Sequence, residues 1–98
     1  MILSPVTTAP PPKIGELTLN QPYDTFVREV LKASPIAALY NMTGLPAMSV
    51  PLHWNKDGLP IGVQFSTSFG AENELLALAS QLEQAAPWAD KRPPLSTL

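Results

Sequence analysis

The sequence predicts an α/β protein in which a small piece of a mixed sheet packs with three helices. Two segments, at about 47–54 and 61–67, alternate apolar and polar residues with period two, as strands with one buried face do. Two others, at about 23–33 and 72–86, repeat apolar residues every three or four positions, as amphipathic helices do. Prolines fall mostly between these segments, which is typical of a folded chain. We therefore expect residues 1–98 to form a single unit.

The N-terminal third begins with a strand and continues as an extended connector. Residues 2–6, Ile-Leu-Ser-Pro-Val, are short and apolar and predict a buried strand. Because the sequence opens directly on this strand, we expect further sequence upstream. Residues 7–22 are expected to be extended, since Pro10-Pro11-Pro12 favours polyproline II and Gly15 allows a turn.

Two helices are predicted next. The first, over residues 23–33, has apolar positions at helical spacing: Tyr23, Phe26, Val27, Val30 and Leu31. Pro35 ends or kinks it. Ser34 fits an N-cap with Pro35 at the first helical position, which predicts a second short helix over 35–42. Gly44 stands where that helix would end on a left-handed residue.

An antiparallel hairpin follows. In the first strand Met48, Val50, Leu52 and Trp54 are expected on one face, and in the second Ile61, Val63 and Phe65. Asn55-Lys56-Asp57-Gly58 between the strands is a strong turn signal. Pro51 has no N–H to donate, so its position is predicted to be an edge or a bulge.

The last predicted helix, over residues 72–86, carries one broad apolar stripe. That stripe consists of Leu75, Leu78, Leu82 and Ala85, widened by Leu76, Ala79 and Ala86. Glu72 and Glu74 lie near its N-terminus, where the helix dipole favours acids, and Pro87 stops it. Residues 88–98 form a proline-rich tail that we expect to lie along the surface.

Composition excludes several classes of function. The net charge is −2 and the six basic residues form no run, which argues against nucleic acid or an anionic membrane as a partner. Charged residues make up only 14%, against about 25% in an average globular protein, which fits a segment surrounded by other protein. With no cysteine there are no disulfides or thiolate metal sites. No apolar run approaches a membrane span or a signal peptide, so a cytoplasmic location is predicted.

No catalytic or metal site can be assigned from the residues. The single histidine, His53, has no second ligand at metal spacing, so a structural role is favoured and neither a metal nor a cofactor is predicted. No serine lies in a Gly-x-Ser-x-Gly elbow or precedes a lysine by three positions. A pair between a serine and Lys13 or Lys32 across space has no support in the sequence. Glu72 and Glu74 are two residues apart and do not face each other on a helix.

Two amides are the candidate site residues, Asn41 and Gln64. Gln64 is a neutral amide on the non-core face of an apolar strand, and Gly62 beside it leaves room for close approach. Asn41 precedes the Gly44 turn. The favoured interpretation is that each amide fixes a turn by bonding loop backbone, and the sharper alternative is contact with a bound substrate.

The chain resembles the C-terminal signature of the amidase-signature hydrolases, which cleave carboxamide C–N bonds. The central residues that carry the resemblance are Asn41-Met42-Thr43-Gly44-Leu45-Pro46-Ala47, Ser49-Val50-Pro51 and Gly58-Leu59-Pro60-Ile61-Gly62-Val63-Gln64. The ordered match extends to both ends, through Leu3-Ser4-Pro5-Val6-Thr7, Gly70, Glu72, Leu82-Glu83, Pro87-Trp88 and Arg92-Pro93-Pro94.

The resemblance implies an α/β/α fold around a mixed sheet and acyl transfer through a serine, a second serine with a cis peptide, and a lysine. No position here matches the motif that holds those three residues, so it implies no catalytic residue in this chain. Glutamine-using relatives tend to carry an acid near the position of Ser34, so a serine there leans toward a general amidase.

Two hypotheses remain open. The chain is either the C-terminal portion of an amidase, inactive alone and partnered with a missing N-terminal catalytic portion, or a non-catalytic interaction or oligomerisation module that self-associates. Unpaired sheet edges and an uncovered apolar face would support association in both cases.

Overall fold

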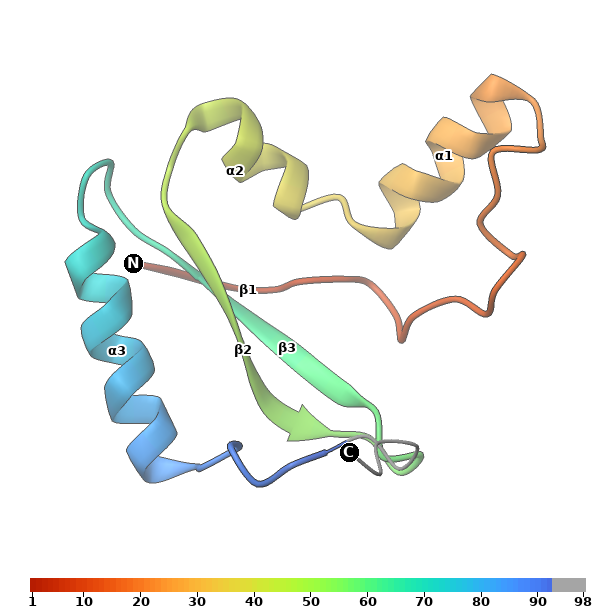
Figure 1. Cartoon of the computed structure of the whole chain (residues 1–98). Coiled ribbons are helices and arrows are strands. Elements are labelled where there is room, and N and C mark those ends of the chain that lie inside the picture. The colour runs from red at the N-terminus through yellow and green to blue at the C-terminus, as the bar shows by residue number, and fades with distance from the viewer. Residues whose placement is uncertain (93–98) are drawn as a thin grey trace.

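The computed structural model describes residues 1–92 and confirms the α/β class, with a three-stranded sheet and three helices. In chain order the elements are β1 (Ile2–Pro5), α1 (Tyr23–Ala33), α2 (Ala37–Thr43), β2 (Ala47–Trp54), β3 (Pro60–Ser66) and α3 (Glu72–Ala85). The strand order is β1-β3-β2, and β3 pairs antiparallel with both neighbours. Figure 1 shows α3 on one side of the hairpin and α1 and α2 on the other.

The β2–β3 hairpin is confirmed, and its loop is held by one side chain. Asn55 Oδ1 accepts hydrogen bonds from the backbone N–H groups of Asp57 and Leu59, both at 2.9 Å. Gly58 takes a positive φ of 78°, which glycine adopts without strain. The local turn chemistry of this segment therefore fixes where the chain reverses.

The hairpin contains the irregularity that Pro51 predicts. Val50 pairs with Val63 and Pro51 with Gly62, but the next pair is His53 with Ile61, so a β-bulge lies between Pro51 and His53. The bulge shifts the pairing register after Pro51. The predicted core face is still confirmed for Met48, Val50 and Leu52, whereas Trp54 at the strand end is not part of that core. β2 is also an edge strand, where a proline is tolerated.

The core lies between α3 and one face of the sheet. Its buried residues are Val50, Phe65 and Leu75, and the half-buried residues packed on them are Met48, Leu52, Val63, Leu78, Leu82 and Trp88. The predicted stripe of α3 is thus confirmed at Leu75, Leu78 and Leu82, whereas Leu76 is exposed. Trp88 packs on this core rather than lying loosely on the surface. Residues 93–98 of the predicted tail are outside the described range.

The N-terminal strand differs from its prediction. β1 pairs with β3 at Ile2–Ser66 through Pro5–Val63, but it is an edge strand whose Leu3 is 68% exposed. The expectation of a buried strand is therefore wrong for this chain, because neither α3 nor another described element covers those side chains. Backbone pairing, rather than burial, holds β1 in place.

The connector is tied to the end of α1. Thr8 donates twice to α1's last carbonyls: its N–H to Ala33 O at 3.1 Å and its Oγ1 to Lys32 O at 2.6 Å. The last carbonyls of a helix have no partner within it, so Thr8 satisfies two of them although it lies far away in the sequence.

The start of α2 is also different from the prediction. Ser34 is the C-cap of α1, its N–H bonding Val30 O, and α2 begins at Ala37 after Ile36. The predicted N-cap at Ser34 is therefore wrong, because its backbone is already used to end the preceding helix. The predicted left-handed residue is confirmed at Gly44, with φ of 72° and its N–H bonded to Tyr40 O. Within residues 1–92, no helix combines the length and apolar character needed to cross a bilayer.

Candidate functional site

A polar row crosses the sheet on the face away from the core. Phe65 and Val63 of β3 face the core, so the intervening residue Gln64 points to the opposite face. Gln64 pairs with Ser4 on β1 and with Ser49 on β2, which places the three polar side chains side by side across the strands. The central strand thus carries the sequence-predicted amide between two hydroxyls.

Gln64 is buried without full hydrogen bonding. The residue is 7% exposed, and its Oε1 has no hydrogen-bond partner among the described residues. The Oγ of Ser4, its partner on β1, is likewise buried and unpaired. An unsatisfied buried polar atom destabilises a fold by about 1–3 kcal/mol, so this face carries two groups that do not help to fold the chain.

The neighbouring serine on β3 behaves differently. Ser66 is fully buried, and its Oγ donates to Pro46 O at 3.0 Å. That bond ties β3 to the segment just before β2. Ser66 is therefore a structural hydroxyl, and its satisfied geometry contrasts with that of Gln64 two positions earlier.

The space beside Gln64 at Gly62 is occupied by the chain itself. A Cβ added at Gly62 would lie 2.8 Å from Ser49 Oγ and 2.9 Å from Val6 Cγ2. The expected room for close approach is therefore filled by the residue after β1 and by a side chain of β2. The missing side chain of Gly62 lets Val6 and Ser49 approach β3 closely.

Asn41 lies on a different element and is exposed. It belongs to α2, whose end is closed by Gly44 N–H bonding Tyr40 O and by Thr43 Oγ1 donating to Leu39 O, both at 2.9 Å. The hydrogen bonds at this turn come from those groups rather than from the Asn41 amide. No hydrogen bond in residues 1–92 joins Asn41 to Gln64.

The other chemistry-bearing residues have structural surroundings. Glu74 Oε2 accepts a 2.7 Å hydrogen bond from Thr67 Oγ1, which ties the start of α3 to the end of β3. Sequence reasoning missed this bond, although Thr67 and Glu74 are only a short loop and the first turn of α3 apart. His53 is exposed, and in the described part of the chain no three His, Asp or Glu side chains gather as metal ligands would. No serine in that part bonds a lysine, and Ser96 lies outside it.

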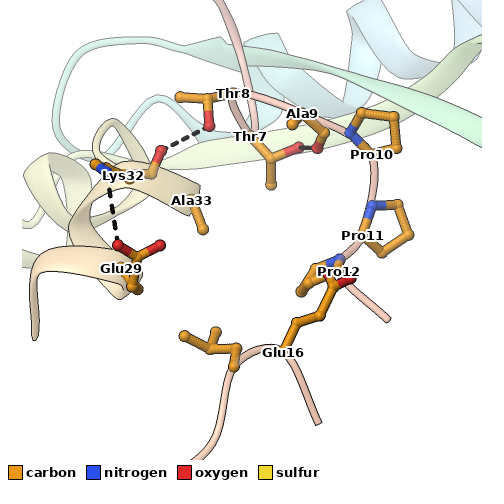
Figure 2. A pocket seen from close by; sticks show the side chains of 11 residues that line it. Thr7, Thr8, Ala9, Pro10, Pro11, Pro12, Glu16, Glu29, Lys32 and Ala33 are labelled. Atoms are coloured by element: carbon orange, nitrogen blue, oxygen red, sulfur yellow. Dashed lines mark hydrogen bonds and ion pairs between the residues drawn. The ribbon is translucent and has the colours of Figure 1, made fainter. Parts of the chain in front are cut away.

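A cleft of about 420 Å³ lies between the connector and α1 (Figure 2). Its lining residues are Thr7, Thr8, Ala9, Pro10, Pro11, Pro12, Glu16, Leu17, Glu29, Lys32 and Ala33. Both threonine hydroxyls are used, Thr7 Oγ1 donating to Ala9 O and Thr8 Oγ1 to Lys32 O. Glu29 and Lys32 form an exposed ion pair at 3.5 Å. The cleft therefore offers no free hydroxyl beside a base, as nucleophilic catalysis requires.

Comparisons with known proteins agree on one family. The family model for amidases matches residues 1–76. The chain is 38% identical over 101 residues to the 6-aminohexanoate-cyclic-dimer hydrolase of Paenarthrobacter ureafaciens, covering 97% of this chain and 20% of that protein. It is 39% identical over 89 residues to the putative amidase AmiC of Mycobacterium leprae, covering 91% of this chain and 19% of that protein.

A solved structure of 6-aminohexanoate cyclic dimer hydrolase matches the fold as well. The TM-score is 0.84 at 37% sequence identity, over 94% of this chain and 20% of that chain. The 98 residues thus span about one fifth of the length of the relatives they match.

Proposed function

The chain belongs to the amidase family, and from this premise we propose that it is the C-terminal portion of an amidase-signature hydrolase whose catalytic residues lie on other sequence. The observation that supports this is the extent of the match: 97% of this chain against 20% of a named hydrolase. A segment of that kind contributes the end of a sheet and a covering helix, as β2, β3 and α3 do.

We propose that the chain alone hydrolyses no amide. Acyl transfer needs an activated nucleophile, a base within hydrogen-bond reach and donors for the developing oxyanion. Two serine hydroxyls within residues 1–92 bond groups that are not bases: Ser66 Oγ donates to Pro46 O, and Ser80 Oγ accepts from Gln84 Nε2. A serine without a base has too little alkoxide character at neutral pH to attack an amide carbonyl.

For the whole protein we propose carboxamide hydrolysis of the general amidase type. Two relatives are named as hydrolases of the cyclic dimer of 6-aminohexanoate. The resemblance also implies the general type, because glutamine-using relatives tend to carry an acid near the position where this chain has Ser34. The cytoplasmic location, the lack of nucleic-acid partners and the single-unit organisation stay predictions of the sequence.

Within that enzyme we propose that Gln64 walls the acyl pocket, with its Oε1 free to accept a hydrogen bond. Support comes from its burial, its unpaired oxygen and its place opposite the core face. Asn41 stays the second candidate, on the exposed side of α2.

The test is a hybrid enzyme in which the 98 residues replace the matched fifth of the Paenarthrobacter ureafaciens hydrolase. We expect the hybrid to release amine from the 6-aminohexanoate cyclic dimer, while the same hydrolase without the segment and the 98-residue chain alone do not. Hydrolysis by the purified chain, lost on serine-to-alanine changes, would refute the proposal. A folded but inactive hybrid would also count against it.

The alternative function, a self-associating interaction module, predicts a different result. The chain would form a defined oligomer in sedimentation experiments. The hybrid enzyme would be no more active than one that carries an unrelated linker in place of the 98 residues. The accessible area of 7504 Å², larger than that of a compact monomer of this mass, favours association.

A further inference from the structure

The chain exposes much more surface than a self-contained protein of its size. Its accessible area is 7504 Å² at 10.6 kDa, whereas a compact monomer of that mass exposes about 5,500 Å². Its radius of gyration is 15.7 Å, against about 13 Å for a compact chain of this length. Any six residues can expose at most the area of an extended chain, so the six residues after Arg92 cannot account for this difference. At least about 1,000 Å² of the excess area belongs to the rest of the chain. One partner of a standard interface buries about 800 Å².

Helix α1 carries an apolar face that the described chain covers only in part, since Phe26 and Val27 are half-buried while Tyr23, Val30 and Leu31 are exposed. Residues of α1 divide cleanly by spacing: Tyr23, Phe26, Val27, Val30 and Leu31 share one face, and Asp24, Thr25, Arg28, Glu29 and Lys32 share the other. No residue of α1 is buried. Tyr23 is 79% and Leu31 54% exposed, although an amphipathic helix gains most of its stability by packing its apolar face.

The hydrogen bonds between the connector and α1 lie at the C-terminal end of the helix. Thr8 bonds the carbonyls of Lys32 and Ala33, and the cleft in Figure 2 is lined on the helix side by Glu29, Lys32 and Ala33. The connector thus fixes the end and the polar flank of α1. It leaves Tyr23 and Leu31 exposed. Helix α1 lies on the other side of the hairpin from α3 (Figure 1).

We propose that the apolar face of α1, defined by Tyr23, Phe26, Val27, Val30 and Leu31, is the docking surface for the catalytic body of an amidase. This inference rests on the proposed function. The occupant is argued from the structural match: 94% of this chain superposes with a TM-score of 0.84 on a segment that makes up 20% of a whole hydrolase. The outlying position of α1 is therefore the one this segment has inside a larger molecule, rather than one formed around a second copy.

The test measures binding rather than activity. The probe is the Paenarthrobacter ureafaciens hydrolase from which the matched fifth has been deleted, titrated with the intact 98-residue chain in sedimentation velocity. Leu31→Asp places a charge on the docking face and is expected to weaken binding by about 30-fold or more. Thr25→Asp adds the same charge on the polar face and is expected to change binding by less than about threefold.

Each outcome is decisive. Because Leu31 is exposed in the free chain, Leu31→Asp is expected to leave its circular dichroism and its unfolding transition unchanged. No binding by the unmodified chain, equal binding by Leu31→Asp, or equal loss with Thr25→Asp would each overturn the proposal. So would a tight homodimer of the chain that Leu31→Asp disperses, since a second copy would then be the occupant. Binding with an inactive hybrid would instead refute the proposed function and leave this surface in place.

Discussion

Replacing Gly62 by alanine tests the closeness of β1 and β2 to the central strand. Gly62 is not among the positive-φ glycines Gly15, Gly44, Gly58 and Gly70, so alanine is compatible with its backbone. The added methyl would lie 2.9 Å from Val6 Cγ2, where carbon atoms normally rest about 3.5–4.0 Å apart. It would also lie 2.8 Å from Ser49 Oγ, which can rotate away because Ser49 is exposed.

The magnitude follows from two opposing effects. Overpacking against Val6 costs about 1–3 kcal/mol, and replacing a strand glycine by alanine regains about 0.5–1 kcal/mol of backbone entropy. We therefore expect Gly62→Ala to lower the free energy of unfolding by about 0.5–2 kcal/mol. In a Val6→Ala background the overlap is gone, so the same change should become neutral or slightly stabilising.

The assay is urea unfolding of the four proteins of this double-mutant cycle. Gly70→Ala is the control, because Gly70 has a φ of 78° with nothing near its missing Cβ. Its strain of about 1–2 kcal/mol should be the same whether Val6 is kept or replaced by alanine. If Gly62→Ala has equal effects in both backgrounds, Val6 does not close over β3 and the geometry assigned to this face is wrong.

Three further predictions concern single side chains. Thr67→Val removes the hydrogen bond to the Glu74 carboxylate and is expected to cost about 1.5–3 kcal/mol in urea unfolding, more than the roughly 1 kcal/mol for the neutral bond lost in Thr8→Val. A larger effect at Thr8 would contradict this ranking. Asn55→Ala leaves the N–H groups of Asp57 and Leu59 unbonded and should cost about 1 kcal/mol, whereas Lys56→Ala in the same loop should cost almost nothing. Gln64→Met removes a buried unpaired oxygen and should stabilise the free chain by about 1 kcal/mol while lowering hydrolysis by the hybrid enzyme. Destabilisation by Gln64→Met would mean that the amide is structural.

Local chemistry made much of the fold predictable. The loop from Asn55 to Gly58 determines its own shape through one side chain and one positive φ, so the hairpin follows from adjacent residues. The stripe on α3 needs only the regular spacing of Leu75, Leu78 and Leu82. In both cases the interactions that decide the structure lie within a few residues of one another.

The errors arise where distant residues decide. Ser34 was predicted to start α2, but its N–H bonds Val30 O at the end of α1, and Thr8 bonds the carbonyls of the two residues before it. Gly62 was predicted to leave room for close approach to β3, but the side chain of Val6, far away in the sequence, fills the space beside it. β1 looked buried because its residues are apolar, whereas the chain alone leaves Leu3 exposed. For the candidate site, the sequence located Gln64 on the correct face but could not show that its oxygen is unpaired.

We propose that these residues complete an amidase whose reactive groups lie elsewhere, and amine release by the hybrid enzyme tests this proposal. We expect steady release from the 6-aminohexanoate cyclic dimer by the hybrid, with none above background from the 98-residue chain at the same concentration. Equal turnover by the chain alone would contradict it, as would a folded hybrid that is no faster than the hydrolase lacking the segment.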